Sequence, residues 1–390
     1  MTRRILVLAL LAGASLLPLG ACASNDDSAG PGADAGGDER APIDAGPDTG
    51  GEAGDDEPTG CAGEWCVVPL DGLRDVSVNA IWGSGPNDVW IVGTRGFAAH
   101  FDGTKWEERR ASTLLSLFSV WGSGPNDVWA GNSGKSFFHW QGASWEETQM
   151  AGDDPRVVLG LSGSGADNVV ALLAPSWSKA IECPGPWGPM MVACPAVFRR
   201  SRVGGELAWR EAADPSFLCD NLWVEGSSTF CSDLSGLWVS PDGEPWLVGE
   251  LGKAVRPRAG ATPPAVAGVP SETHSITTLE AIAGTSATDV WSVGGAGTIR
   301  RYAGGPDWSI TPSPTNAHLR AVWAGSAKEA WAVGEDGVVV RWDGESWEVS
   351  PTPLVDDLAR DLRAVWGVAN GDTWAAGERV LLHRKAGTQP

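Results

Sequence analysis

A motif that recurs seven times along the chain constrains its fold more than any other feature. The segment Trp82-Gly-Ser-Gly-Pro-Asn-Asp-Val-Trp90 returns unchanged at residues 121–129. Including weaker copies, the motif starts at Trp82, Trp121, Ser162, Trp238, Ala283, Trp323 and Trp366. The starts lie 39 to 45 residues apart, except for one interval of 76 residues. A period near 40 residues, built from short β-rich segments, is typical of a solenoid, an array or a propeller.

Each unit of the repeat predicts four short strands. The sixth unit has four apolar runs separated by turns, at 319–323, 329–333, 338–342 and 346–350. Asp-Gly and Gly-rich turns between such runs indicate β-hairpins. Four antiparallel strands make one propeller blade. We therefore predict an all-β fold, a seven-bladed β-propeller of four-stranded antiparallel blades over residues 61–390.

The seventh unit lacks a fourth strand, since the chain ends at Pro390 soon after the third run at 380–384. A run that is similar to a fourth strand, Glu64 to Pro69, instead precedes the first unit. We expect this N-terminal strand to complete the last blade, which would close the ring and remove a sheet edge. The alternatives are an open blade or a strand from a partner.

The repeat also explains why the chain holds 22 Trp but only one Tyr and eight Phe. Seventeen Trp occupy three equivalent places: the repeat start, eight residues later, and the fourth strand. The turns at 101–106 and 342–347 place an Asp-Gly pair ahead of a Trp. In these features the chain resembles bacterial β-propellers with Trp-rich repeats, and the turns resemble the Asp-box (BNR-like) motif of sialidase-type propellers. The resemblance implies the fold but no activity, because propellers host many unrelated functions.

The first 21 residues have the pattern of an export signal peptide. A basic start precedes an apolar run, Ile5 to Leu19, that is too short to span a bilayer comfortably. The ending Leu-Gly-Ala-Cys22 resembles the lipobox of bacterial lipoproteins, which implies that Cys22 becomes a lipidated N-terminus anchored by several acyl chains. In Gram-negative lipoproteins, an Asp directly after the lipidated Cys retains the protein on the inner membrane, and this chain has Ala23 at that position. We therefore expect an outer-membrane lipoprotein, facing the periplasm or the surface, in the cell envelope of a Gram-negative bacterium.

Residues 22–60, the lipidated Cys and the segment after it, have the composition of a disordered tether. From Ala23 to Gly60 there are eleven Asp or Glu, one basic residue and almost no large apolar residue, so burial cannot offset the entropy of ordering. A flexible chain of this length reaches about 35 Å, with a ceiling near about 130 Å. The tether carries −10 and the signal +2 of a net charge of −21, leaving −13 on residues 61–390. This balance excludes a nucleic-acid binder, which needs a basic surface.

Two sets of polar residues recur in every unit. Six residues after the repeat starts lie Asp88, Asp127, Asn168, Glu244, Asp289, Glu329 and Asp372. Near the ends of the third strands lie His100, His139, Arg202, Arg256, Arg301, Arg341 and Arg384. The second and third strands form a hairpin, so we expect one polar pair per blade. Recurrence in all seven blades favours a structural pair over a basic ring for an anionic ligand.

Six cysteines remain after Cys22, an even number in an exported chain, and so we expect disulfides. Their order favours bonds between neighbours: Cys61–Cys66, Cys183–Cys194 and Cys219–Cys231. Sequence alone allows 15 pairings. No Cys/His cluster has the spacing of a zinc site, and we expect neither a metal nor another cofactor.

The long interval between repeats locates two insertions. One, 175–195, lies between the second and third strands of the third blade, and the other, 214–232, lies between the third and fourth blades. In a propeller these two kinds of loop emerge on the same face. The insertions contain the three Trp that the repeat does not use, and Trp on loops is favoured at binding sites, although such loops can also pack on themselves. The candidate ligand-binding residues are Trp177, Lys179, Glu182, Trp187, Asp220, Trp223 and Glu225.

Catalytic signatures are scarce. The sequence contains neither His-Glu-x-x-His nor Gly-x-Ser-x-Gly, while carboxylate pairs drawn from different blades escape sequence analysis. We therefore expect a monomeric, membrane-anchored extracytoplasmic lipoprotein whose propeller is a non-catalytic binding or scaffold module for a protein or a glycan. The alternatives are a carbohydrate-active enzyme, a glycosidase or lyase acting on extracellular polymer, and a structural envelope component.

Overall fold

The computed structural model describes residues 60–134, 136–149, 156–183, 190–212, 234–257, 268–354 and 359–387. Within these ranges, the side chains of 149, 177–179, 181–183, 190–192, 257, 269 and 270 are not described. The chain divides into two compact units, Met1–Gly54 and Asp55–Pro390, and every described residue belongs to the second unit. The expected signal peptide, Cys22 and all of the tether before Gly60 therefore lie outside the described residues. In the described part of the chain, no helix is long and apolar enough to cross a membrane.

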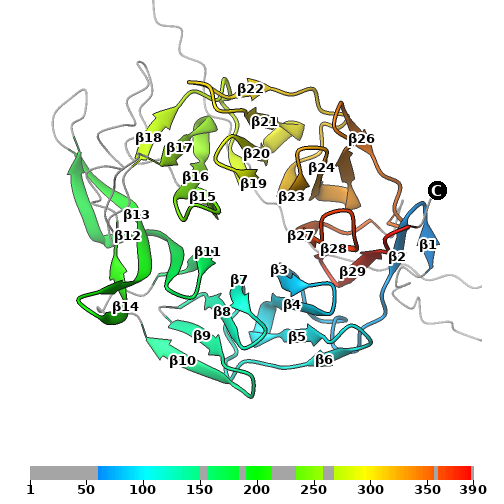
Figure 1. Ribbon diagram of the computed structural model, residues 1–390, viewed down its shortest axis with the longest axis horizontal. Helices are drawn as coiled ribbons and strands as arrows, with labels where there is room; N and C mark the ends of the chain where they lie inside the picture. Colours follow the sequence, from blue (N-terminus) through cyan, green and yellow to red (C-terminus); the bar gives the residue numbers. More distant parts are fainter. Residues whose placement is uncertain are drawn as a thin grey trace, which may run out of the picture. The chain divides into compact units, whose positions relative to one another are not determined.

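The second unit is a ring of seven antiparallel β-sheets, as the sequence predicts (Figure 1). The sheets follow one another around the ring in chain order, and the first strand of each lies nearest the centre. Within six of the seven sheets the strands are also in chain order, so each of these blades is a β-meander, while the seventh sheet combines strands from both ends of the described chain. We number the blades from 1 to 7 in the order of their repeat starts.

The strands of the blades fall into four concentric positions. The inner strands are β3 (Val78–Gly85), β7 (Leu117–Gly124), β11 (Val158–Gly165), β15 (Leu234–Val239), β19 (Leu279–Ser286), β23 (Leu319–Ser326) and β27 (Leu362–Gly367). The second strands are β4 (Asp88–Gly93), β8 (Asp127–Asn132), β12 (Asn168–Cys183), β16 (Pro245–Gly249), β20 (Asp289–Gly294), β24 (Glu329–Gly334) and β28 (Thr373–Gly377).

The third strands are β5 (Ala98–Phe101), β9 (Ser136–Trp140), β13 (Met190–Val203), β17 (Ala254–Pro257), β21 (Ile299–Tyr302), β25 (Val339–Trp342) and β29 (Val380–Arg384). The outer strands are β6 (Trp106–Glu108), β10 (Trp145–Gln149), β14 (Glu206–Glu211), β18 (Gly268–Ser271), β22 (Ser309–Ile310), β26 (Trp347–Val349) and, in blade 7, β2 (Trp65–Val67). Turns between second and third strands include the short 3-10 segments η1 (Thr94–Gly96), η2 (Glu250–Gly252), η3 (Gly295–Gly297) and η4 (Glu335–Gly337).

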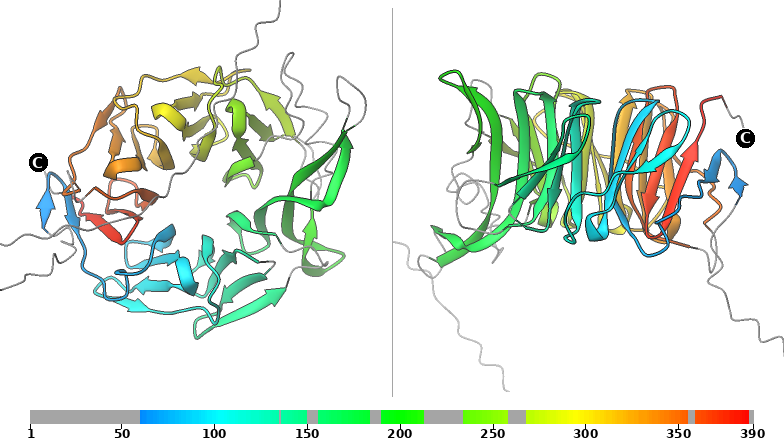
Figure 2. Two further views of the ribbon diagram at one scale, coloured as in Figure 1. Left: turned by 180° about the vertical axis from the view of Figure 1, so that it is seen from behind. Right: turned by 90° about the horizontal axis from the view of Figure 1, so that it is seen from below.

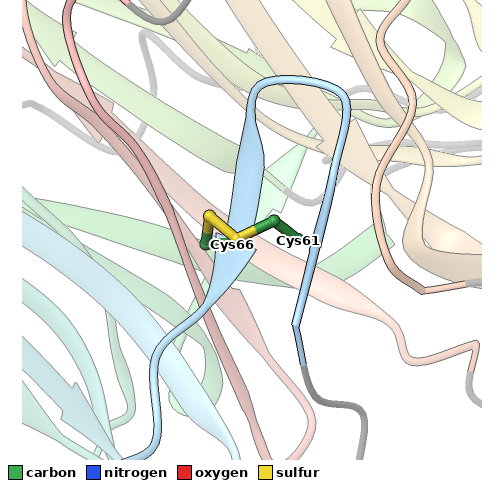
Figure 3. The surroundings of a disulfide bond; sticks show 2 residues. All are labelled: Cys61 and Cys66. Carbon is green, nitrogen blue, oxygen red and sulfur yellow. A yellow bond between two sulfur atoms is a disulfide. The ribbon is translucent and has the colours of Figure 1, made fainter.

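The ring closes through its N-terminal strand, as predicted. β2 pairs antiparallel with β29, and Trp65 lies opposite Arg384. An additional strand that the sequence did not predict, β1 (Cys61–Ala62), pairs with β2 and makes the sheet of blade 7 five-stranded. The expected disulfide between Cys61 and Cys66 joins β1 to β2 (Figure 3). Because β2 covers β29, that strand no longer offers an open edge to other chains.

Side chains of the closing hairpin fasten it to blades 6 and 7. Trp65 is fully buried, and its ring meets that of Trp331 edge-on, with 5.4 Å between the centroids. The indole Nε1 of Trp65 donates a hydrogen bond to Ser350 Oγ at 3.1 Å. In the turn between β1 and β2, Glu64 Oε2 accepts a hydrogen bond from Arg384 Nε at 2.5 Å. The first described strands therefore contribute packing and charge to the far end of the chain.

The described core consists of seven apolar clusters, one at each interface between neighbouring blades. The second-strand repeat position places a buried indole at six of these interfaces, from Trp90, Trp129, Trp246, Trp291, Trp331 and Trp374. Each of these rings contacts aromatic rings of the next blade. Trp90, for example, lies 5.0 Å from Trp140 and 5.3 Å from Trp145. The Trp excess therefore belongs to the interfaces that hold the blades together.

The Trp at a repeat start packs on the Gly that follows the next repeat start. A Cβ on Gly122 would lie only 2.6 Å from Trp82 Cη2. The same contact joins Trp121 to Gly163, Trp238 to Gly284 and Trp366 to Gly83. In blade 3 the start residue is the small Ser162, and the next blade carries Val239 in place of the Gly. Ser162 Oγ accepts a hydrogen bond from the backbone N–H of Val239 at 2.9 Å. The two positions are thus matched in size across the interface between blades.

The first insertion differs from the loop that we expected. β12 and β13 continue through it as one long hairpin, in which Ile181 lies opposite Val192 and Cys183 lies opposite Met190. Pro and Gly, which end strands, are concentrated at 184–189, so the backbone pairing can extend to either side of this segment. The hairpin stands out beyond the rim of the ring (Figures 1 and 2). The second insertion, 214–232, lies outside the described residues.

Candidate functional site on the insertion face

The first insertion belongs to one face of the ring, which we call the insertion face; that the second insertion shares this face stays a prediction. The insertion face is formed by the turns between second and third strands and by the linkers that lead from one blade into the next inner strand. These turns and linkers hold each other. The backbone N–H of Gly96 in η1 donates to the carbonyl oxygen of Leu115 at 2.9 Å, and that of Glu335 in η4 donates to His318 O at 3.0 Å. The insertion face is therefore a set of short, mutually braced loops.

The predicted ligand-binding residues fall mostly outside the described side chains. Trp177, Lys179 and Glu182 lie in β12, within the long hairpin, and only their backbone is described. The remaining candidates, which lie outside the described residues, are Trp187, Asp220, Trp223 and Glu225. Their convergence on one surface stays a prediction.

The cysteines of the insertions are described in part. Cys194 in β13 is buried and disulfide-bonded. Its bonding partner belongs to the cysteines whose side chains are not described, as the expected partner Cys183 does. The expected bond between Cys219 and Cys231 lies outside the described residues. Cys194 therefore forms a disulfide, as expected, while the identity of its partner stays a prediction.

Sequence reasoning missed a set of exposed apolar side chains on the insertion face. Of the eight exposed large apolar residues in the described part of the chain, five lie on this face: Leu114, Leu115, Phe118, Leu251 and Ile276. Leu114 and Ile276 are 88% and 87% exposed. Both stand seven residues before a repeat start, among Ser and Thr residues of a linker. That contrast between the two large apolar residues and their small polar neighbours was the available signal.

Charged side chains of blades 5, 6 and 7 form a network on the same face. His318 Nε2 lies 3.1 Å from Glu280 Oε1, and Arg320 Nη2 lies 2.9 Å from Glu335 and 3.2 Å from Asp361. Each of these carboxylates has a basic partner, and the network links three blades. Among the side chains that the structure describes, no three His, Cys, Asp or Glu lie close enough together to hold a metal ion.

On the opposite face, the predicted polar pair occurs together with a stacked Trp. In blade 2, His139 Nε2 lies 2.7 Å from Asp127 Oδ1, and the same carboxylate accepts a hydrogen bond from Ser123. The His139 ring stacks on Trp129, with 3.8 Å between the centroids. The same arrangement occurs with His100, Asp88 and Trp90 in blade 1, and with Arg301, Asp289 and Trp291 in blade 5. These pairs fasten the second strand to the third, which supports their structural interpretation.

Blades 3 and 7 correct the predicted partners. In blade 7, Asp372 pairs with His383 at 3.0 Å, not with Arg384, because the turn between β28 and β29 is one residue shorter than that between β24 and β25. In blade 3, Asn168 accepts a hydrogen bond from Arg199 Nε at 2.7 Å. The expected partner, Arg202, lies farther along the long third strand and pairs with Asp167.

Blades 4 and 6 also depart from the predicted pattern. Arg256 of blade 4 donates a hydrogen bond to Tyr302 Oη of blade 5 at 3.0 Å. In blade 6, Glu329 accepts one from the backbone N–H of Asn370 in blade 7 at 2.6 Å, while Arg341 lies 3.9 Å from Glu64. In both blades, residues expected to pair within one blade instead connect neighbouring blades.

Burial shifts the protonation of these pairs. It lowers the pKa of His139 below its ordinary value, although Asp127 raises it in part. Burial likewise lowers the pKa of His383, against the effect of Asp372. For Asp127, burial raises the pKa, but hydrogen bonds from Ser123 and His139 outweigh it and hold the pKa below its usual value. All three groups therefore bind a proton less readily in the folded chain than in the unfolded chain.

We expect the free energy of unfolding to fall as the pH falls below about 6.5, the pKa of an unfolded His. In this window His139 and His383 stay neutral in the folded chain while the unfolded chain takes up protons, which favours unfolding. The lowered pKa of Asp127 adds a further loss below about pH 3.9. Urea unfolding followed by Trp fluorescence between about pH 8 and pH 5 measures the first window.

The matched control replaces His139→Gln and His383→Gln together. Gln can keep a hydrogen bond to the partner carboxylate but does not titrate, so the dependence on pH should flatten even if the overall stability changes. An unaltered dependence in this double variant would contradict the assignment.

A cavity of about 1200 Å³ opens at the seam between blades 7 and 1. Phe101, Trp106 and Trp374 line it together with the connector that follows β2. Two carboxylates in its wall are already engaged, Glu64 by Arg384 and Asp372 by His383. The cavity lies beside the closing strand rather than among the linkers of the insertion face, and so it does not extend the candidate site.

Solved structures share this architecture. A structure titled "YCF48 from Cyanidioschyzon merolae" is 18% identical, covers 83% of this chain and 99% of its own, and has a TM-score of 0.63. "YCF48 bound to D1 peptide" is 16% identical, with coverages of 85% and 98% and a TM-score of 0.60. "Streptogramin B lyase structure" is 13% identical, with coverages of 82% and 96% and a TM-score of 0.60. No protein-family model and no curated protein sequence matches the chain. At these identities the likeness establishes the fold, a seven-bladed β-propeller, and nothing narrower.

Proposed function

We propose that the protein is a lipid-anchored lipoprotein of the bacterial cell envelope whose propeller binds a partner protein through its insertion face. The observation that carries the proposal is the concentration of exposed apolar side chains there: five of the eight in the described part of the chain. Burial of such side chains stabilises a complex by about 1.5–3 kcal/mol each when it is complete. Loops held on a rigid ring commonly carry binding residues.

The chemistry of these side chains favours a protein over a glycan. Four of the five are aliphatic, whereas glycan sites usually present flat aromatic rings to the sugar. Among the structures of similar fold, one is described as bound to a peptide, which supports peptide binding as a use of such a ring. The three insertion Trp residues keep a glycan as the second candidate, since Trp177, Trp187 and Trp223 would provide aromatic surface.

The anchor rests on the sequence. Cys22 would carry the acyl chains, and the acidic segment up to Gly60 would act as the tether to the first strand. The absence of Asp at position 23 favours the outer membrane. Because β1 is the outermost strand of blade 7 (Figure 1), the tether would join the ring at its rim.

Photo-crosslinking in intact cells tests this proposal. A benzophenone amino acid in place of Leu115 should give a covalent adduct of defined mass, because this residue is 46% exposed on the insertion face. The matched control carries the same group in place of Ile310, which is 63% exposed on the outer strand β22, and should give no such adduct. An adduct that protease removes identifies a protein partner, and one that only glycosidases remove identifies a glycan. Equal labelling at both positions, or none, would contradict the proposed binding face.

A further inference from the structure

In the linker into blade 2, an exposed apolar residue, which we call the tip of the linker, is carried by backbone that is held on both sides. Leu114 is 88% exposed. The residue before it, Thr113, packs closely against Gly96 of the neighbouring turn. A Cβ on Gly96 would lie 2.0 Å from the Thr113 carbonyl oxygen. The residue after it, Leu115, accepts a hydrogen bond from Gly96 N and donates one to Thr113 Oγ1 at 3.1 Å. Both neighbours of Leu114 are therefore tied down, while its side chain projects into solvent.

The linker into blade 5 repeats this construction. Ile276 is 87% exposed. The residue before it, Ser275, is pressed against Gly252, where a Cβ would lie 2.0 Å from the Ser275 carbonyl oxygen. Gly96 and Gly252 have φ of 67° and 69°, a conformation that only Gly adopts without strain. Further hydrogen bonds hold the linker, from Thr273 Oγ1 to Gly252 O at 2.5 Å and from the backbone N–H of Thr277 to Ser275 Oγ at 3.3 Å.

The position of the tip carries other residues in other blades, and the linker into blade 6 also repeats the scaffold. The equivalent position, seven residues before the repeat start, holds Asp75, Asn316 and Ala359 in the linkers into blades 1, 6 and 7. In the linker into blade 6, Gly297 is pressed against Thr315 O just as closely, yet the tip is polar. Packing of the ring therefore does not demand an apolar tip. Leu114 and Ile276 are therefore available for an interaction outside the ring.

The two tips stand across the centre of the insertion face from each other. Each linker enters its inner strand three residues after the tip, at Leu117 of β7 and at Leu279 of β19. Blades 2 and 5 are three steps apart in a ring of seven, and Figure 1 shows β7 and β19 facing each other across the centre. Phe118, the second residue of β7, and Leu251 in η2 are also partly exposed.

We propose that one extended or helical segment of the partner protein crosses the centre of the insertion face and is held at both ends, by Leu114 on one side and Ile276 on the other. This inference rests on the proposed function and adds how the partner binds. Because both tips are fixed before binding, little conformational entropy is lost when they are buried. They have the properties of anchor residues at a protein interface.

A membrane surface fits the two tips less well than a protein segment does. A flat bilayer would meet the equivalent tips Asp75 and Asn316 together with Leu114 and Ile276, and burying a carboxylate without a partner is unfavourable. The propeller also carries −13, which opposes approach to anionic lipids. A narrow segment can contact the two apolar tips and leave the polar ones solvated.

Reciprocal photo-crosslinking of the full chain in intact cells tests the crossing. With the benzophenone probe at position 114, the adduct should have the same mass as with the probe at 276. Adding Ile276→Asp should weaken the adduct from 114 at least about tenfold, the effect of losing one anchor residue. Adding Leu114→Asp should do the same to the adduct from 276. Ile310→Asp, an exposed change on the outer strand, should alter neither.

Three outcomes would overturn the inference. The first is adducts of different mass at positions 114 and 276. The second is an adduct yield that does not change when the other tip is replaced by Asp, and the third is adducts with lipid only. In each of these cases, a protein adduct from the probe at Leu115 would still support the proposed function. Absence of the adduct at Leu115 would contradict the proposed function itself. Melting temperatures of the two Asp variants should match the parent, since both sites are almost fully exposed.

Discussion

Trp65→Ala is expected to lower the free energy of unfolding by about 3–5 kcal/mol, the usual cost of emptying a buried Trp site. Trp65 is fully buried, and its indole contacts Trp331 and donates to Ser350. It also belongs to the strand that joins the two ends of the ring. Its loss therefore weakens the closure of the ring as well as one interface between blades. Urea unfolding followed by fluorescence measures the change.

Trp347→Ala is the matched control for this prediction. Trp347 occupies the equivalent fourth-strand position in blade 6 and is 5% exposed, but its strand follows β25 directly in the chain. We expect a similar cavity cost there with the ring still closed. Limited proteolysis should therefore cut only the Trp65→Ala variant faster near β29. A change below about 1 kcal/mol for Trp65→Ala would show that β2 does not seal the ring.

Gly122→Ala is expected to lower the free energy of unfolding by about 1–3 kcal/mol, the cost of overpacking a core. The added Cβ would lie 2.6 Å from Trp82 Cη2 and 2.7 Å from the backbone oxygen of Asp127. The contact with Trp82 can be separated from the contact with the backbone, because Trp82→Ala relieves only the first. A double-mutant cycle should therefore give a coupling of about 0.5–3 kcal/mol between positions 82 and 122.

Gly124→Ala provides the control for this cycle. It lies in the same strand two residues later, and nothing stands within 4 Å of the place of its Cβ. Its effect should be small and additive with Trp82→Ala. Additivity of Gly122→Ala with Trp82→Ala would instead show that the start residue of one blade does not pack on the next.

The fold was predictable because every copy of the motif places residues of the same kind at the same positions of the same strands. The motif start and the position eight residues later lie opposite each other across the first hairpin, as Trp82 and Trp90 do. Both rings then pack against the following blade. A unit of this kind cannot bury its apolar face alone, so the number of units fixes the number of blades. The missing strand at one end and the spare strand at the other predicted the closure that β2 and β29 make.

The candidate site was less predictable, because it depends on lengths and neighbours that the repeat does not encode. Taking the basic residue near the end of each third strand assigned Arg384 and Arg202 to polar pairs that His383 and Arg199 make. One residue fewer in a turn, or a longer hairpin, changes the residue that lies opposite a given carboxylate. The exposed tips were missed for a related reason, since a Leu in a linker has no periodicity to mark it.

The sequence by itself determined the all-β class, the number of blades, the order of their strands and the joining of the ends. The class, the number of blades and the strand order follow from local patterns, apolar alternation and Gly-rich turns, that recur in every unit; the joining of the ends was the favoured prediction among alternatives. Only the tertiary structure decided which side chains remain exposed after the blades assemble. Leu114 and Leu117 are three residues apart and equally apolar, yet one is 88% exposed and the other is fully buried. Leu117 opens the inner strand β7 and packs in the core between blades 1 and 2, whereas Leu114 lies in the linker before that strand, a difference in tertiary neighbours that no local pattern reveals.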